Sequence, residues 1–262
     1  MFFNHFHMQD NPFAENPPAE WLLTDERFEQ ALARLDFFSA QGAFALIMGQ
    51  TGVGKSTLLR LFTRTLLPNR FHRLYMHQTS INPGAFLRMI VVGLGESPRL
   101  GKDRLLLQIT DKIQASEIDT LLVIDEAHLL AAQTLTDLRL LVNTGLEKRL
   151  PLKIILCGQE PIGDLLKRSA HADLVHRIAV RIRLHSLSKA QTSAYMDHRL
   201  RCAGASDKLF DPEAKALIHD YAGGIPRQIN NIATGCLIQA AAKNAKIIND
   251  QIVNDTIADF QI

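Results

Sequence analysis

A glycine-rich segment between two apolar runs constrains this chain more than any other feature. Residues 49–57 read GQTGVGKST and fit the pattern G-x-x-x-x-G-K-[ST]. The apolar run 43–48 precedes the segment and the run 58–62 follows it, which predicts a buried strand, a tight loop and a helix. Glycines 49, 52 and 54 let the backbone curl so that successive N–H groups point at phosphate oxygens. We therefore predict a phosphate-binding P-loop rather than a simple glycine-rich turn.

The side chains of this loop predict ATP and Mg²⁺ as its ligands. Lys55 would reach the β- and γ-phosphates, and Ser56 places a hydroxyl where a nucleotide-bound Mg²⁺ needs an oxygen ligand. Thr57 follows Ser56 on the first helical turn. The predicted nucleotide-binding residues are Gly49, Gln50, Thr51, Gly52, Val53, Gly54, Lys55, Ser56 and Thr57.

A second acidic motif supports this interpretation. Residues 120–124 form a continuous β-type run that ends in Asp125 and Glu126, as a central parallel strand would deliver carboxylates to the edge of a sheet. Asp125 would hold Mg²⁺, and Glu126 would accept a proton from, or orient, the water that attacks the γ-phosphate. The alternative is an acidic cap for the next helix. Residues 125–128 also spell DEAH, the name of a helicase class, but we find no second ATPase core of the kind such helicases carry.

Three further polar residues are candidates for the same chemistry. Gln159 follows the apolar run 152–157 and would hydrogen-bond the γ-phosphate or the attacking water, unless it faces solvent. Arg177 precedes an alternating strand and would act as an arginine finger on a neighbouring subunit, the alternative being a solvated strand face. Arg227 begins a helix and would touch the γ-phosphate from a lid, or else is a surface charge.

Hydrophobic periodicity divides the chain into three segments. Residues 24–186 alternate strands and helices, which predicts an α/β nucleotide-binding domain with a parallel central sheet. One of its expected helices carries Leu135, Leu138, Val142 and Leu146 on one face. Residues 187–262 are wholly helical and predict a small lid domain. Residues 1–23, called the arm below, are rich in Phe and Pro and need a surface to pack on.

Composition adds limits on the partners and the compartment. Lys and Arg total 29 against 27 acidic residues, a net charge of +2 that neither demands nor excludes nucleic acid. Cysteines 157, 202 and 236 lie in or beside apolar runs without metal-ligand spacing, so we expect reduced core thiols. No run is long enough to span a membrane and no secretory signal is evident, which favours a cytoplasmic protein.

These motifs, in this order, resemble the AAA+ ATPases, and more narrowly the family of general secretion pathway protein A (ExeA-like). The resemblance covers nearly the whole chain and rests on residues 11–13 (NPF), the P-loop, residues 122–128 (LVIDEAH), residues 156–159 (LCGQ), Tyr195 with Arg199-Leu200, and residues 223–230 (GGIPRQIN). It implies an AAA+ P-loop NTPase fold with a helical lid, Gln159 as sensor 1, Arg177 near the arginine finger and Arg227 as sensor 2. One departure is Phe6-His7-Met8 where the family has Phe-Gly-Leu, which leaves the contact of the arm with adenine open.

The resemblance also implies function. Short ATPases with this motif set are similar to regulators of DNA transposition (TnsC-, IstB- and TniB-like), which assemble with ATP on duplex DNA and recruit or stimulate a transposase. We prefer this hypothesis, with a homo-oligomer, ring or filament, that binds ATP between subunits. One alternative is an ExeA-like secretion or envelope-assembly ATPase that acts with a membrane partner. The other is a nucleotide-dependent binding module with negligible turnover.

Overall fold

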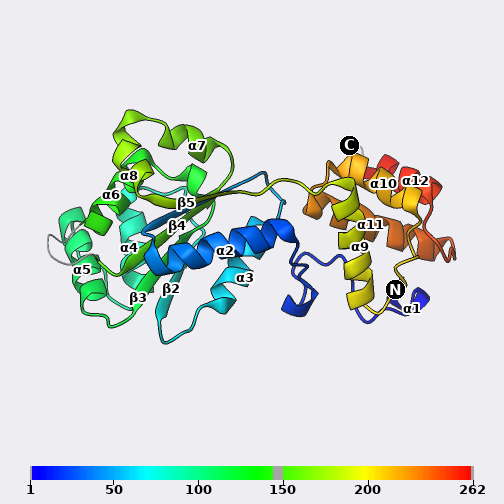
Figure 1. Ribbon diagram of the computed structural model, residues 1–262, viewed down its shortest axis with the longest axis horizontal. Helices are drawn as coiled ribbons and strands as arrows, with labels where there is room; N and C mark the ends of the chain where they lie inside the picture. The colour runs from blue at the N-terminus through cyan, green and yellow to red at the C-terminus, as the bar shows by residue number, and fades with distance from the viewer. Residues whose placement is uncertain (1, 144–149, 261–262) are drawn as a thin grey trace. The chain divides into compact units, whose positions relative to one another are not determined.

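The described part of the protein divides into two compact units. A computed structural model describes residues 2–143 and 150–260 (Figure 1). The α/β unit comprises Glu26–Gln50 and Lys55–Leu184. The helical unit combines Met1–Asp25, Thr51–Gly54 and His185–Ile262. The tip of the P-loop is therefore grouped with the helical unit, while both flanks of the loop belong to the α/β unit.

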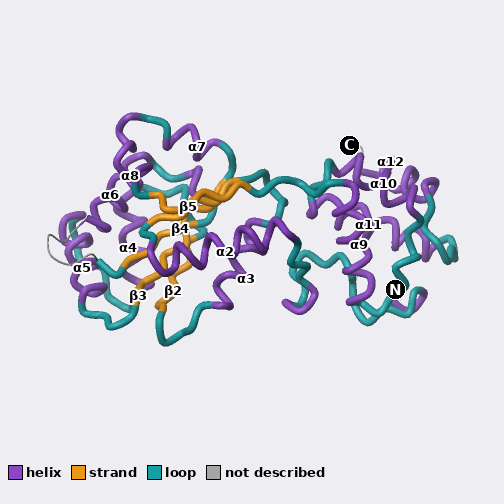
Figure 2. Tube along the Cα trace, in the orientation of Figure 1, coloured by secondary structure: helices purple, strands orange, loops and turns teal. Residues whose placement is uncertain are grey.

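A five-stranded sheet forms the centre of the α/β unit (Figure 2). The strands are β1 (Phe44–Met48), β2 (Phe71–Met76), β3 (Asp119–Ile124), β4 (Leu152–Gly158) and β5 (Ile178–Arg183). They are ordered β2-β3-β4-β1-β5, and every neighbouring pair is parallel. All carboxyl ends of the strands therefore meet at one edge, where a doubly wound sheet binds its ligands.

Helices cover both faces of this sheet, which explains the uninterrupted apolar runs in its central strands. One face carries α2 (Glu26–Gln41), which contacts β1, β5 and α3 (Lys55–Thr65). On the other face, side chains such as Leu122 and Ile154 share a core with α4 (Pro83–Gly93), α5 (Lys102–Gln114) and α6 (Ala132–Asn143). Leu135, Leu138 and Val142 lie in this core as predicted, whereas Leu146 lies outside the described residues.

Two short helices lead from β4 to β5. They are α7 (Pro161–Leu166) and α8 (Ala172–His176), with a 3₁₀ turn at Ser169–His171 between them. Leu166 and Leu174 bury their side chains in the same core as α4 and α6. These helices therefore belong to the packed layer of the α/β unit.

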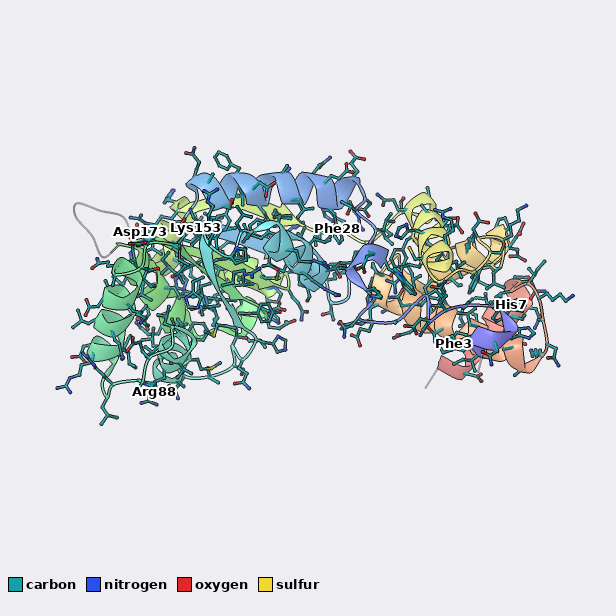
Figure 3. The ribbon with its side chains drawn as sticks, turned by 90° about the horizontal axis from the view of Figure 1, so that it is seen from below. Phe3, His7, Phe28, Arg88, Lys153 and Asp173 are labelled. Carbon is teal, nitrogen blue, oxygen red and sulfur yellow. The ribbon has the colours of Figure 1, made fainter. Side chains whose placement is uncertain are left out.

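A lysine near the amino end of β4 shows how the sheet tolerates a buried charge (Figure 3). Lys153 is 9% exposed. Its Nζ donates to the carbonyl of Gly42 at 3.3 Å and lies 3.7 Å from an Asp119 carboxylate oxygen. Burying an ammonium group is costly unless it is paired and hydrogen-bonded, and Lys153 meets both conditions.

The helical unit is built from four longer helices and the arm. They are α9 (Lys189–Cys202), α10 (Pro212–Ala222), α11 (Pro226–Ala242) and α12 (Asp250–Phe260); the arm contributes α1 (Phe2–His5) and a 3₁₀ turn at Ala19–Trp21. Ser188 and Gln191 form a capping box at the start of α9, and Asp211 caps α10. The apolar stripe of α11 belongs to the core: the buried residues are Ile229, Ile232, Ala233, Cys236, Leu237 and Ala240.

The arm packs into the core of the helical unit, as its aromatic content led us to expect. Phe13 is 2% exposed and meets Phe210 edge to face at 6.0 Å. Met8 is buried in the same cluster, and Phe2 and Phe3 pack against it. The arm is therefore part of the folded unit.

A buried arginine fixes the arm to α9. Arg199 is 3% exposed, and its guanidinium donates to the carbonyl of Pro12 at 2.5 Å and to that of Ala14 at 2.9 Å. It also donates to the Tyr195 hydroxyl, which in turn donates to Asn230 of α11. Burial lowers the pKa of Arg199 and raises that of Tyr195. This network joins residues of the Asn-Pro-Phe, Tyr-Arg and Gly-Gly motifs that the sequence presents far apart.

No helix in the described ranges 2–143 and 150–260 is both long enough and apolar enough to cross a bilayer.

The Arg199 network predicts a measurable loss of stability on its removal. Arg199→Met keeps much of the side-chain volume but leaves the Pro12 and Ala14 carbonyls without their buried donor, which we expect to cost about 2–4 kcal/mol. Urea denaturation followed by circular dichroism measures this. Arg201→Met on the same helix is the control: Arg201 is an exposed ion-pair partner of Asp207 at 3.6 Å, so its loss should cost less than about 1 kcal/mol. Equal effects of the two changes would contradict the assignment.

Candidate nucleotide-binding site

The P-loop lies where the sequence predicts it, between β1 and α3. Gly52 and Gly54 have backbone φ angles of 82° and 107°, which residues other than glycine rarely adopt. The loop is held to the neighbouring strand because the Gly49 N–H donates to the Gly158 carbonyl at 3.3 Å. These contacts place the loop at the carboxyl edge of the sheet.

Lys55 points back along its own loop. Its Nζ donates to the carbonyls of Gly49 and Gln50, both at 2.9 Å, and the residue is only 7% exposed. An ammonium group has three N–H donors, and these two bonds use two of them. The two bonds thus hold the positively charged ammonium group of Lys55 against the P-loop.

Asp125 follows β3 and is almost fully buried at 3% exposure. Its Oδ2 accepts from the Tyr75 hydroxyl at 2.5 Å, and its Oδ1 accepts from the Glu126 N–H at 2.9 Å. Nδ1 of His77 lies 3.9 Å from the same Oδ2. Each carboxylate oxygen is therefore fixed by a donor, which orients Asp125 at the sheet edge.

The surroundings of Asp125 keep nearby acidic protons in place. Partial desolvation of the hydroxyl, together with its hydrogen bond to Asp125, raises the pKa of Tyr75 well above its usual range, although the residue as a whole is 55% exposed. Burial also raises the pKa of the Cys157 thiol well above its usual value, with the negative charge of Asp125 adding to the effect. The phenol of Tyr75 thus remains a donor to the carboxylate.

The donor chemistry here fits Mg²⁺. Asp125 supplies carboxylate oxygens and Ser56, which is exposed at the start of α3, supplies a hydroxyl; Mg²⁺ prefers such hard oxygen ligands. Within the described residues no group of three or more His, Cys, Asp or Glu is arranged to hold a metal. Mg²⁺ bound with a nucleotide needs no such cage, because phosphate oxygens and water complete its coordination.

Glu126 and Gln159 lie side by side although they come from different strand ends. β4 lies between β1 and β3, so Gln159 emerges between the P-loop strand and the strand that carries Asp125. Gln159 Nε2 is 3.5 Å from Glu126 Oε2. The structure thus brings Lys55, Asp125, Glu126 and Gln159 to one edge of one sheet.

Arg177 lies at the opposite edge of the sheet. It is exposed and immediately precedes β5, whose first residue, Ile178, pairs with Phe44 at the amino end of the parallel strand β1. Five residues of strand separate this edge from the P-loop, roughly 17 Å at the usual rise per residue. Arg177 is therefore not part of the site assembled by its own α/β unit.

The two arginines of β5 have partners within the α/β unit. Arg181 donates to the Val175 carbonyl at 3.2 Å, and Arg183 lies 2.9 Å from Glu160. Both are exposed on the alternate face of the strand, as the sequence pattern indicates.

Arg227 begins α11 in the helical unit, next to the tip of the P-loop. Its N–H donates to the Gly52 carbonyl at 3.3 Å, and a Cβ on Gly52 would lie 2.9 Å from the Arg227 Cβ and 3.0 Å from Ile225. The glycine is thus required by this close approach as well as by its φ angle. The guanidinium is half exposed and pairs with Glu15 of the arm at 3.2 Å.

Two residues at this edge escaped the sequence-based prediction. Tyr75 pairs in register with Val123, and its hydroxyl extends to Asp125, two residues further along the chain and just past the end of β3. Thr79 is 1% exposed, and its hydroxyl donates to the Glu126 carbonyl at 3.0 Å. The sequence gives no signal for either contact, because both depend on which strand lies beside β3 and in which register.

A P-loop, a carboxylate pair at the end of β3 and a fully parallel sheet together define the α/β unit as a P-loop nucleotide-binding fold. Residues 39–166 match a family model described as an AAA domain. General secretion pathway protein A of Aeromonas hydrophila is 31% identical over 263 residues, an alignment that covers 96% of this chain and 47% of that protein. The chain thus spans about half the length of this curated relative.

Solved structures support the same fold. Cdc6p of Pyrobaculum aerophilum has a TM-score of 0.74 and 17% identity, with 96% of this chain and 71% of that chain covered. A chain of Drosophila ORC bound to DNA has a TM-score of 0.75 and 19% identity, with 96% of this chain and 64% of that chain covered. The Thermotoga maritima RuvB branch migration motor has a TM-score of 0.60 and 18% identity, with 92% of this chain and 70% of that chain covered. The predicted fold, an AAA+ P-loop NTPase with a parallel sheet and a helical lid, is confirmed.

The environment of the three cysteines predicts their reactivity. Burial raises the pKa of Cys157 and raises that of Cys236 to about 11, so at about pH 8 both remain thiols, and only the thiolate is nucleophilic. Cys202 is partly exposed. Alkylation with iodoacetamide, read by mass spectrometry, should label Cys202 first in the native protein and all three cysteines in urea. Native labelling of Cys157 at the rate of Cys202 would show that the site edge is more open than described.

Proposed function

We propose that the protein binds ATP with Mg²⁺ and hydrolyses it. One observation carries the proposal: the sheet order puts Lys55, Asp125, Glu126 and Gln159 at the same edge, with both oxygens of Asp125 held by donors. The P-loop N–H groups and Lys55 would bind the phosphates, and Ser56 and Asp125 would hold the metal ion. Bound Mg²⁺ would neutralise the charge that develops on the phosphates.

Glu126 and Gln159 would act on the attacking water. Glu126 is partly exposed, and its carboxylate can accept a proton from water or orient it. The Gln159 amide can donate to the γ-phosphate or to that water. Arg227 would report the bound nucleotide to α11, because its backbone already contacts Gly52 of the P-loop.

The position of Arg177 supports a site completed by a second copy of the chain. An exposed arginine at the amino edge of the sheet lies about 17 Å of strand away from its own P-loop. In a head-to-tail assembly it would reach the γ-phosphate of a neighbour and act as an arginine finger. ATP would then favour assembly, in a ring or a filament, and assembly would favour hydrolysis.

Two partners are candidates for what this ATPase acts on. The similarity to general secretion pathway protein A, which extends over 96% of this chain, favours an envelope or secretion partner. Duplex DNA is the second candidate, and a transposase recruited to that DNA is a further hypothesis that rests on the sequence resemblance alone.

The charge distribution supports the DNA candidate. From Phe37 to Gly95 the sequence contains no Asp or Glu, although the chain as a whole is nearly balanced. Within this stretch Arg64 lies in the last turn of α3, Arg70 precedes β2, and Arg73 on β2 donates to the Thr63 carbonyl at 2.7 Å; all three are exposed. Arginines bind phosphate in a planar, bidentate manner.

The hydrolytic role of Glu126 is tested by Glu126→Gln. We expect kcat for ATP to fall at least about 100-fold while the affinity for nucleotide stays within about twofold, because the change removes a base and leaves the P-loop intact. Phosphate release and binding of a fluorescent nucleotide measure the two quantities. Glu96→Gln, at an exposed ion pair with Lys112, is the matched control and should leave both unchanged. Undiminished turnover in Glu126→Gln would contradict the catalytic role of this carboxylate, whereas negligible turnover in the unchanged protein would favour a nucleotide-dependent binding module.

The partner is tested with a double variant, Arg64→Gln with Arg70→Gln, and with Arg88→Gln as control. Arg88 lies on α4, on the side of the α/β unit away from α2 (Figure 3). The measurement is the affinity for duplex DNA in the presence of a slowly hydrolysed ATP analogue at several salt concentrations. If the protein binds DNA, the slope of log K for DNA binding against log salt concentration should become shallower by about 2 in the double variant. The slope should not change in the control. Binding to anionic vesicles and not to DNA would favour the envelope partner.

A further inference from the structure

The chain reverses direction abruptly after β3, and this reversal holds Glu126 in an unusual conformation. Glu126 has φ 49° and ψ 36°, a left-handed geometry that is uncommon for residues with a side chain. Two donors clamp its carbonyl: the Leu129 N–H at 2.9 Å and the buried Thr79 hydroxyl at 3.0 Å. Strained conformations of this kind persist only where the surroundings determine them, and they cluster at functional sites.

The turn directs His128 back towards the side chain of Glu126. The 3₁₀ turn Ala127–Leu129 follows Glu126 directly, and the His128 side chain is only 11% exposed. Nδ1 of His128 lies 3.4 Å from Glu126 Oε2. The same Nδ1 accepts a hydrogen bond from the backbone N–H of Gln159 at 3.3 Å.

The end of β4 is shaped to allow this contact. A Cβ on Gly158 would lie 3.1 Å from the main-chain nitrogen of His128 and 3.3 Å from Nδ1 of its ring. A larger residue would push β4 and the 3₁₀ turn apart. Gly158 thus lets the strand end approach closely enough for Gln159 to donate to His128.

From these contacts we propose that His128 is a positioning residue that couples Glu126 to Gln159. Nδ1 of the imidazole accepts from the Gln159 main chain and lies against the Glu126 carboxylate without a hydrogen bond to it, so the ring packs between the two groups that act on the attacking water and limits how closely they approach. The proposal rests on the proposed ATP hydrolysis and adds a third residue to it. His128 itself makes no contact with nucleotide in this role.

A purely space-filling histidine would behave differently on substitution. Leucine and asparagine have nearly the same shape, but only asparagine carries an oxygen that can replace Nδ1 as the acceptor for the Gln159 N–H. His128→Asn and His128→Leu therefore form a matched pair. If His128 only fills space, the apolar leucine is tolerated at least as well as asparagine.

The experiment measures kcat, KM and nucleotide affinity of the full-length chain in both variants. We expect kcat of His128→Leu to fall about tenfold with KM and affinity within about twofold, because small misplacements of reacting groups slow the chemical step. His128→Asn should retain kcat within about threefold. Hydrogen exchange supplies a readout independent of turnover: the Gln159 amide should exchange faster in His128→Leu and stay protected in His128→Asn.

The outcomes separate this proposal from the proposed function. Loss of turnover in Glu126→Gln with undiminished turnover in His128→Leu would overturn the role of His128 alone. Equal loss in both His128 variants, with equal loss of thermal stability, would also overturn it, because the side chain would then serve only packing. Undiminished turnover in Glu126→Gln would instead reject the catalytic role of Glu126 on which the proposal rests.

Discussion

The parallel alignment of five strands in the order β2-β3-β4-β1-β5 is the constraint on which the candidate site depends. It brings the ends of β1, β3 and β4 to one edge although their sequences are far apart. The insertion of β4 between β1 and β3 then requires close packing at that edge. Gly158 meets this requirement because its backbone receives the Gly49 N–H on one side and approaches His128 on the other.

Much of this arrangement could be predicted from the sequence. The P-loop and the Asp125-Glu126 pair combine a recognisable pattern with a strand that is buried on both faces, so motif and periodicity agree. The helical part was equally clear, because Asp211-Pro212 and Gly223-Gly224 mark the start and the end of α10. In such segments the local sequence alone determines the structure.

The contacts that orient the site could not be predicted in the same way. Tyr75 meets Asp125 only because β2 pairs with β3 in one particular register. Thr79 and His128 act through backbone groups of Glu126 and Gln159, and no residue pattern identifies a backbone partner. Arg199 looked like part of a family motif, yet its partners are two carbonyls of the arm. Long-range polar contacts of this kind depend on the folded topology.

The anchoring of the arm by Arg199 has a consequence for how the chain folds. The hydrogen bond from Arg199 to Pro12 closes a loop of 187 residues, which contains the entire α/β unit. At a synthesis rate of about 5–20 residues per second, α9 is synthesised on the order of 10–40 s after the arm. Its phenylalanines are without their final packing partners throughout that time. The helical unit can therefore complete its core only after α9 to α12 have been synthesised, and until then the apolar side chains of the arm lack their native contacts.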